Sequence, residues 1–367
     1  MKEKNFKSLS DYKEEVHRCS KCGICQSDCP LFKLTGNECT VSRGQFIMLD
    51  GIIHGKLKMN KNINKYLDLC LKCNKCSKVC PSEINVVDII LSAKHEYFKQ
   101  SLIGKIYALL ESKWIFNTGL NLIKIISKIF HRKKITPQPQ NPTTTAVYFG
   151  GCISALKPHI TDYANNLLHK MNIKTYDIDF NCCGMPFYTT GNIERFAEQA
   201  KENISKIPDE CEYLITDCAS CEWAWKQYAK MIDDNKLNKL KIIDIYSLIE
   251  KNGLKFTADK NYKVTYHKPC HSENNSGINI IKNIDNVIYN EMVGFDDCCG
   301  FGNFEHPLSL RDTKPIRETK KNNIINANAD ILLTTCAGCI ISMSIITRLK
   351  QKTKRLISFL AENCKSK

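Results

Sequence analysis

The sequence lacks the features that would assign its 367 residues to several large classes of protein. The amino-terminal stretch MKEKNFKSLSDYKEE is charged and has no apolar core, so we expect no secretory signal. No run of about twenty apolar residues occurs, so we expect no transmembrane helix. There is no P-loop, and GFGNFE from Gly300 lacks the third glycine of a dinucleotide-binding motif. A flavin or nicotinamide site in this chain is therefore not supported.

Cysteine, in contrast, is abundant, with 21 residues. A chain of this length buries a core without disulfides. A chain without a secretory signal is expected in a reducing compartment, where clustered cysteines indicate metal or redox chemistry. We therefore expect a cytoplasmic protein that uses its thiols to bind metal.

Eight cysteines form a short repeat. The runs CSKCGICQSDCP from Cys19 and CLKCNKCSKVCP from Cys70 both fit C-x2-C-x2-C-x3-C-P, the bacterial ferredoxin motif for [4Fe–4S] clusters. In two-cluster ferredoxins the fourth cysteine of each run binds the other cluster. Structural zinc uses two separated pairs of ligands, which these runs do not match. The motifs predict one cluster on Cys19, Cys22, Cys25 and Cys80, and a second on Cys70, Cys73, Cys76 and Cys29.

Ten further cysteines form a longer repeat. Each copy has one cysteine after an expected strand, then Cys-Cys-Gly, then C-x2-C after another strand. Five thiols in three places can surround a polynuclear iron–sulfur site, and adjacent cysteines also suit a thiol/disulfide pair; spacing alone leaves open that only some bind metal or that they serve packing. The two sets are Cys152, Cys182, Cys183, Cys218 and Cys221, and Cys270, Cys298, Cys299, Cys336 and Cys339. Cys39, Cys211 and Cys364 fit neither repeat, and we assign them no role.

The chain between these repeats predicts the domain organisation. ITPQPQNPTTT, from Ile135 to Thr145, is rich in proline and indicates a linker. After it, β-branched runs such as TAVYFGG, EYLIT, KVTYH and DILLTT alternate with helical stretches, which favours α/β layering with a mainly parallel sheet. We expect an α-helical ferredoxin domain with two [4Fe–4S] motifs at 1–100, an amphipathic helical segment and linker at 101–145, and two duplicated α/β modules at 146–258 and 259–367.

The net charge and one basic segment bear on partners. The formal charge of +15 suits an anionic partner, but clusters of charge about −2 would offset part of it, and no nucleic-acid-binding motif is present. We expect no nucleic acid. In WIFNTGLNLIKIISKIFHRKK, apolar residues share one helical face: Leu122, Ile125, Ile126, Ile129 and Phe130. Such a helix either lies on an anionic membrane surface or packs on the core with a solvated basic side.

The motifs GCIS, CCGMPFYTTG and DCASC, repeated as YHKPCH, CCGFGN and TCAGC, resemble the CCG-domain family of cysteine-rich iron–sulfur oxidoreductases. TGNECTVSRGQ and CPSEINVVDII resemble the paired-cluster half of the same proteins, so the resemblance covers nearly the whole chain. Members are the iron–sulfur subunits of glycolate oxidase, lactate dehydrogenases and anaerobic glycerol-3-phosphate dehydrogenase, and the catalytic subunit of heterodisulfide reductase.

The resemblance carries several expectations. In the heterodisulfide reductase the five-cysteine module binds a noncubane [4Fe–4S] cluster, which implies one or two such clusters here in addition to the two cubanes. Many hydroxyacid-oxidase subunits lack part of the first set, whereas this chain has both sets complete. Arg43 and Gly44 belong to a segment that recurs in the family; spacing alone favours a turn with a solvated arginine.

These observations favour an electron-transfer subunit of a membrane-associated flavin-dependent dehydrogenase acting on glycolate, lactate or glycerol 3-phosphate. Its expected partners are an FAD-linked dehydrogenase subunit and the quinone pool or a membrane cytochrome, at the cytoplasmic face of the inner membrane. One alternative is a heterodisulfide-reductase-like subunit that cleaves a disulfide at a noncubane cluster. Another is a scaffold whose modules only bind partners. His267 and His271 flank Cys270 and are either proton donors beside a cluster or ordinary loop histidines.

Overall fold

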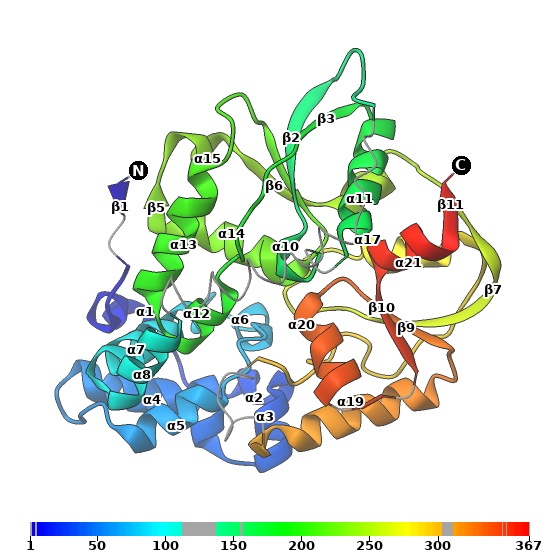
Figure 1. Ribbon diagram of the computed structural model, residues 1–367. Coiled ribbons are helices and arrows are strands. Elements are labelled where there is room, and N and C mark those ends of the chain that lie inside the picture. The colour runs from blue at the N-terminus through cyan, green and yellow to red at the C-terminus, as the bar shows by residue number, and fades with distance from the viewer. Residues whose placement is uncertain are drawn as a thin grey trace.

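The computed structural model describes residues 2–3, 6–111, 137–154, 157–302, 311–346, 348–349 and 351–366. Figure 1 shows a helical amino-terminal part, in blue and cyan, beside two α/β units, in green and in yellow to red. We call these the ferredoxin domain (residues 6–111), module 1 (β2 to α16) and module 2 (β7 to β11).

The ferredoxin domain consists of short helices joined by tight turns. In α3 (Pro30–Thr35), proline occupies the first turn, where its missing N–H costs nothing, and Cys29 is the N-cap residue. In α5 (Lys61–Leu69), the Asn60 side chain accepts hydrogen bonds from two backbone N–H groups and so caps the helix. The other elements are η1 (Leu9–Tyr12), α1 (Lys13–His17), α2 (Ile24–Asp28), η2 (Glu38–Thr40), α4 (Ser42–Ile53), α6 (Lys75–Lys78), α7 (Val86–Gln100) and α8 (Leu102–Leu110).

Module 1 is a four-stranded parallel sheet in the order β3-β2-β4-β6. Its strands are β2 (Thr144–Phe149), β3 (Ile173–Tyr176), β4 (Tyr213–Thr216) and β6 (Lys241–Asp244). Its helices are α10 (Gly151–Ser154), α11 (Pro158–Lys170), α12 (Met185–Thr190), α13 (Ile193–Ser205), α14 (Ala219–Met231), α15 (Asn235–Lys239) and α16 (Ile245–Lys251). A short strand, β5 (Ile232–Asp233), pairs with β1 (Lys2–Glu3) at the amino terminus.

Module 2 repeats this sheet in the order β8-β7-β9-β10, again parallel, and adds one antiparallel strand, β11, beside β7. Its strands are β7 (Phe256–His267), β8 (Ile284–Tyr289), β9 (Ile331–Thr334), β10 (Lys352–Arg355) and β11 (Cys364–Ser366). Its helices are α17 (Ser276–Lys282), α19 (Lys314–Asn326), α20 (Ala337–Ile340), the π-helical turn η3 (Ile341–Ile346) and α21 (Leu356–Asn363). The equal strand order confirms that the modules are duplicates.

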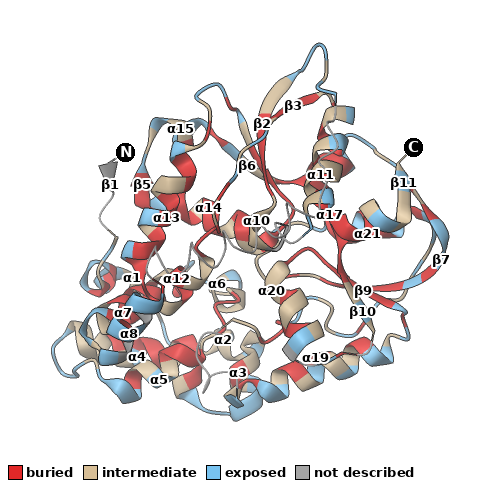
Figure 2. Cartoon of the chain, in the orientation of Figure 1, coloured by how far each residue is buried: buried red, intermediate tan, exposed pale blue. Residues whose placement is uncertain are grey.

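The three parts pack on one another. The central strands are buried along most of their length (Figure 2), as expected for parallel sheets covered on both faces. Buried apolar clusters draw members from both modules, including Ile215 of β4 and Leu333 of β9. The buried carboxylate of Asp217 pairs with the buried guanidinium of Arg355 across the same boundary. The ferredoxin domain contacts module 1 through α7 and α12, and module 2 through α3 and α19.

The strands and helices expected after the linker are confirmed as a succession of parallel α/β units. Strand β2 begins at Thr144, within the stretch 135–145 predicted as linker, because its threonines already pair with β3. The exact domain boundaries stay a prediction. The basic amphipathic segment with Leu122 and Phe130 lies outside the described residues. Among the helices that are described, none is both long and apolar enough to cross a bilayer.

Candidate metal centres

Four predicted cysteines surround one pocket of the ferredoxin domain, which we call pocket A. Its empty volume is about 410 Å³, and its lining includes Cys19, Cys22, Cys25 and Cys80. The first three sulfurs come from the first motif and the fourth from the second motif. The structure thus brings together the cross-motif set that the ferredoxin spacing predicts.

The other four cysteines surround a second pocket, pocket B, also of about 410 Å³, whose lining includes Cys29, Cys70, Cys73 and Cys76. Cys76 lines both pockets. Burial raises the pKa of the Cys29 thiol to about 11, so metal has to displace a firmly held proton there. The shared wall places the two pockets next to each other.

The loops around these pockets have an unusual backbone. Lys21 and Gly23 in the first motif have positive φ angles of 58° and 86°, and Lys72 and Asn74 have 51° and 60° at the same places in the second. Lysine rarely adopts this left-handed conformation. Turns of alternating hand point successive backbone N–H groups inward and so form an anion-binding concavity, as at many iron–sulfur sites. The pockets therefore fit anionic clusters in their thiol lining and in their backbone polarity.

Pocket A is lined or supported by two residues to which the sequence spacing assigned no role. Arg43 lines the pocket, and its Nη1 lies 3.8 Å from Glu38 Oε1. Gly44 lies at the start of α4, where a Cβ atom would come within 2.1 Å of the Glu38 carbonyl oxygen. The contact requires glycine, which the SRG sequence alone could not reveal.

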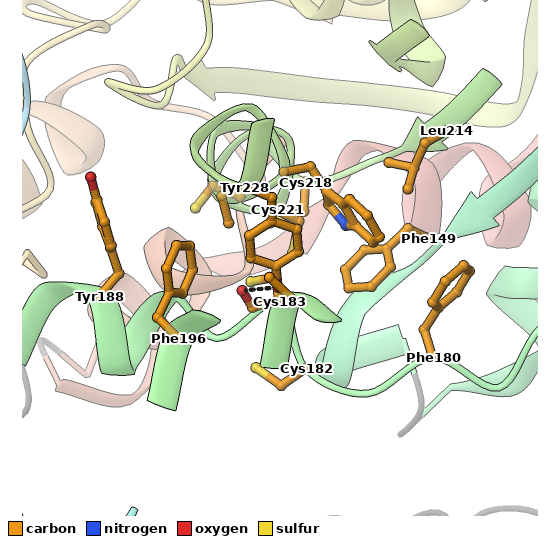
Figure 3. Close-up of a cluster of buried hydrophobic side chains, with 14 of the residues drawn as sticks. Phe149, Phe180, Cys182, Cys183, Tyr188, Phe196, Leu214, Cys218, Cys221 and Tyr228 are labelled. Carbon is orange, nitrogen blue, oxygen red and sulfur yellow. Dashed lines mark hydrogen bonds between the residues drawn. The ribbon is translucent and has the colours of Figure 1, made fainter. Parts of the chain in front are cut away.

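In module 1 the five predicted thiols gather below the carboxyl ends of β2 and β4. Four of them are buried and Cys152 is half-buried. The thiols of Cys152 and Cys182 are hydrogen-bonded, as are those of Cys183 and Cys221. Hydrogen bonds from Cys182 and Cys221 lower the pKa of the Cys183 thiol to about 6, which favours the thiolate that binds metal. Figure 3 shows four of the five cysteines, Cys182, Cys183, Cys218 and Cys221, together with neighbouring aromatic side chains.

Module 2 gathers its five thiols in the same way. The sulfurs of Cys299 and Cys339 are 3.3 Å apart, and a hydrogen bond from Cys298 lowers the pKa of Cys270 to about 6. His267 is fully buried, and its Nε2 lies 3.3 Å from the sulfur of Cys339. Its Nδ1 lies 3.2 Å from the Phe295 carbonyl oxygen. Ligand atoms of His267, Cys299 and Cys339 lie close enough to share a metal ion.

The two five-cysteine groups meet. Cys218 is the N-cap residue of α14 and Cys336 is the N-cap residue of α20, and their thiols are hydrogen-bonded across the module boundary. The hydroxyl of Ser220, from module 1, lies 3.1 Å from the Cys336 sulfur. The Ala337 N–H of module 2 donates to the Cys218 sulfur at 3.4 Å.

Pocket B adjoins module 2. Cys73 and Cys298 belong to one buried cluster. Burial is the main cause of the raised pKa of the Cys73 thiol, and the nearby thiol of Cys270 raises this pKa further. The buried Lys72 donates from Nζ to the Gly302 carbonyl oxygen at 3.1 Å. Pocket B therefore adjoins the thiols of module 2, which in turn meet those of module 1 at Cys336 and Cys218.

The two candidate histidines have different surroundings. His267 is enclosed, whereas His271 is partly exposed and stacks on Trp223, with ring centroids 4.6 Å apart. His271 Nδ1 lies 3.3 Å from the Ser220 hydroxyl and Nε2 lies 3.1 Å from the Lys72 carbonyl oxygen. Their roles stay predictions, as does the absence of a role for Cys39, Cys211 and Cys364, which line neither pocket A nor pocket B.

Two pockets, each lined by the four cysteines of one predicted cluster, and a duplicated α/β unit with five thiols per copy define an iron–sulfur protein. Comparison with family models agrees: residues 15–84 match a 4Fe-4S dicluster domain, and residues 146–226 and 264–344 each match the cysteine-rich domain CCG. The chain belongs to the CCG-domain iron–sulfur oxidoreductases, and its cofactors are [4Fe–4S] clusters. The expected family is confirmed.

Curated relatives include subunits of three named enzymes. The chain is 24% identical to one of the subunits of the fumarate reductase (CoM/CoB) of Methanothermobacter marburgensis, over 90% of this chain and 68% of that protein. It is 23% identical to one of the subunits of the dihydromethanophenazine:CoB–CoM heterodisulfide reductase of Methanosarcina acetivorans, over 89% and 87%. It is 20% identical to a probable glycolate oxidase iron-sulfur subunit of Bacillus subtilis, over 94% and 93%.

A solved structure also resembles this chain. The crystal structure of a hypothetical protein from Helicobacter pylori aligns with a TM-score of 0.50 at 11% identity, over 96% of this chain and 74% of that one. At this identity the likeness shows the fold alone.

Proposed function

We propose that this chain is the electron-transfer subunit of a membrane-associated flavin-dependent dehydrogenase that oxidises glycolate, lactate or glycerol 3-phosphate. One observation carries the proposal: the cysteine groups form an unbroken series, since Cys76 lines both pockets, Cys73 adjoins Cys270, and Cys218 adjoins Cys336. A series of neighbouring groups suits a protein that conducts electrons.

The ligands we propose are the cysteines that the motifs predict. Cys19, Cys22, Cys25 and Cys80 would hold one cubane cluster in pocket A, and Cys70, Cys73, Cys76 and Cys29 would hold another in pocket B. Each five-cysteine set would hold one noncubane cluster. When bound, these clusters supply one-electron carriers. The surrounding chain buries half of the proposed ligand cysteines and donates hydrogen bonds to sulfur, which sets the potentials of the clusters.

The proposed partners follow from this role. A relative named as a glycolate oxidase iron-sulfur subunit supports an FAD-linked dehydrogenase subunit as the electron donor. Quinone or a membrane cytochrome would accept the electrons at the cytoplasmic face of the membrane. The acceptor would dock near module 1, because that module ends the series.

A second function is favoured by a specific observation. Both five-cysteine sets are complete, and they meet at Cys218 and Cys336, so a disulfide substrate could be reduced between them. The likeness to a heterodisulfide reductase subunit supports this alternative. In a third reading, the modules would only bind partners, and residues after Thr145 would then fold without iron.

The test is anaerobic affinity purification of the tagged chain from its host's solubilised membranes, with mass spectrometry of what co-purifies and iron analysis. About sixteen irons per chain would fill all four sites, and about eight would fill the pockets alone. An FAD-linked dehydrogenase as the main partner supports the proposed function. A membrane cytochrome b without a flavoprotein, together with about sixteen irons, would replace it with the disulfide-reducing alternative.

A further inference from the structure

The duplicated modules differ at the strand end beside their thiols. Phe149 is the last residue of β2 and pairs with Thr216 of β4, while His267 is the last residue of β7 and pairs with Thr334 of β9. The registers show that Phe149 and His267 occupy the same place. Both side chains are fully buried. An aromatic hydrocarbon in module 1 is thus replaced in module 2 by an imidazole that contacts a sulfur, since His267 Nε2 lies 3.3 Å from Cys339.

A 13-residue helix downstream of Cys-Cys-Gly carries uncharged side chains in module 1 and cations in module 2 at two of its positions. This helix, α13 or α19, has 13 residues in both modules. Its fourth residue is Phe196 in module 1 and Arg317 in module 2, and each faces the glycine of Cys-Cys-Gly. Its seventh residue is Gln199 in module 1 and Lys320 in module 2. All four side chains are at least 95% buried.

The cations of module 2 lie near its thiols and donate hydrogen bonds to the backbone beside them. Lys320 Nζ donates to the carbonyl oxygens of Gly294 and Phe295, at 2.5 and 3.3 Å, and stands within electrostatic reach of Cys298, Cys299 and Cys339. Arg317 Nη1 donates to the Gly300 carbonyl oxygen at 3.2 Å, next to Cys299. The carboxylate of Asp297 also acts on Lys320 through space, and it pairs with Lys75 at 2.7 Å.

Module 1 surrounds its thiols with rings and balanced charges. Phe149 packs against Phe180 and Trp225, with centroids 5.2 and 5.4 Å away (Figure 3 labels both phenylalanines). The buried Arg195 faces two carboxylates, those of Glu198 at 3.6 Å and Glu202 at 3.9 Å. Module 2 contributes Arg355 beside Cys218, and the charge of Arg355 is likewise matched by Asp217 of module 1.

We propose that module 2 holds the cluster of higher reduction potential and is the place where electrons from pocket B accumulate, while module 1 holds the cluster of lower potential. Each step moves one electron, which oxidises the pocket B cluster and reduces the module 2 cluster. Added negative charge is stabilised by nearby cations and by hydrogen bonds to sulfur. This difference in potential is set by three positioning residues that act on the cluster through its surroundings, namely Lys320, Arg317 and His267. The inference rests on the proposed function, because it requires clusters in both modules.

The consequence is a storage step. An electron that enters through Cys73 and Cys270 reaches the cluster of higher reduction potential first. Its transfer onward to module 1 is then unfavourable in free energy and proceeds only when an acceptor removes the electron from module 1. Electrons therefore wait inside the protein, away from the module that ends the series.

The experiment is a reductive titration of the anaerobically prepared full chain, followed by electron paramagnetic resonance. Signals are assigned to modules through Cys183→Ser and Cys299→Ser, each of which removes one module's signal. Lys320→Gln and His267→Phe install the residues of module 1 in module 2. Lys314→Gln removes an exposed charge from the same helix and is the matched control.

In the unaltered protein we expect the module 2 signal to appear at the higher potential. Lys320→Gln should shift the one-electron equilibrium of that signal at least tenfold toward the oxidised form, which corresponds to about 59 mV. Lys314→Gln should shift neither signal. A module 1 potential equal to or above that of module 2 overturns the inference, whether or not the variants fold. So does an equal shift in Lys320→Gln and Lys314→Gln. An iron content near eight per chain would show that the modules hold no clusters. It would therefore overturn this inference and the disulfide-reducing alternative together.

Discussion

The thiols of Cys218 and Cys336 are hydrogen-bonded to each other although they belong to different modules. They hold the same position in the two copies, each as the N-cap residue of the helix after the third strand of the repeat. The contact makes the two five-cysteine groups one continuous array of buried sulfur. A substitution of either cysteine should therefore alter the surroundings of the thiols in both modules.

Replacing Cys76 by serine should empty pocket B. Cys76 is one of the four sulfurs proposed to bind that cluster, and a hydroxyl is a poor ligand for iron. We expect the loss of about four irons per chain, measured by iron analysis after anaerobic purification. Cys39→Ser is the control, and an equal loss in both variants would contradict the proposed ligand set.

The ion pair between Asp217 and Arg355 should matter for the joining of the modules. Both side chains are buried, so Asp217→Asn leaves an uncompensated guanidinium in the interior. Loss of one partner of such a pair costs about 3–5 kcal/mol of the free energy of unfolding. Urea denaturation followed by circular dichroism measures it. The double variant Asp217→Leu, Arg355→Met should recover most of the loss, and failure to do so would show that the charge is not the cause.

Stability should fall on mild acidification because of His95. Burial lowers the pKa of His95, which links α7 to module 1 through Nδ1, 2.9 Å from the Gly191 carbonyl oxygen. A histidine whose folded pKa lies below its unfolded value contributes stability above the unfolded pKa, and this is lost as the pH falls toward the folded pKa. Unfolding midpoints in urea should therefore drop between about pH 7.5 and about pH 5.5.

The variant His95→Gln should show a smaller drop over the same range, since it removes the titrating group. His159→Gln changes an exposed histidine and is the control, expected to behave as the unaltered protein. Identical pH dependence in all three proteins would refute the role of His95.

Gly44→Ala should destabilise the ferredoxin domain. The added Cβ would approach the Glu38 carbonyl oxygen to 2.1 Å, so the backbone around pocket A must move, at a cost of about 1–3 kcal/mol. Gly51→Ala in the same helix is the matched control, because its Cβ would meet only the flexible side chain of Leu57 and alanine favours a helix. Thermal unfolding should show a clear loss for the first variant alone.

Much of the site was visible in the sequence because its ligands are local. The spacing of Cys19, Cys22 and Cys25 fixes a tight loop, and a matching run at Cys70 implies a partner. The alternation of strands and helices followed from apolar runs such as EYLIT, which becomes the buried strand β4.

Other features depend on how distant parts dock, which spacing does not encode. The meeting of Cys218 with Cys336 and the contact of Lys72 with Gly302 are set by packing between modules and domains. The importance of Gly44 could not be seen, because the carbonyl that excludes a side chain comes from another turn. The replacement of Phe149 by His267, in contrast, could have been found by aligning the two repeats.

A contact between a residue and its own counterpart, such as that of Cys218 with Cys336, is the kind made by two identical subunits about a two-fold axis. Identical subunits must present identical residues on both sides of that axis. Here the two halves are parts of one chain, so each side can change by mutation without the other. Because the two modules are joined in one chain, their architecture is symmetric while their side chains differ. Cations surround the thiols of module 2, and aromatic rings surround those of module 1.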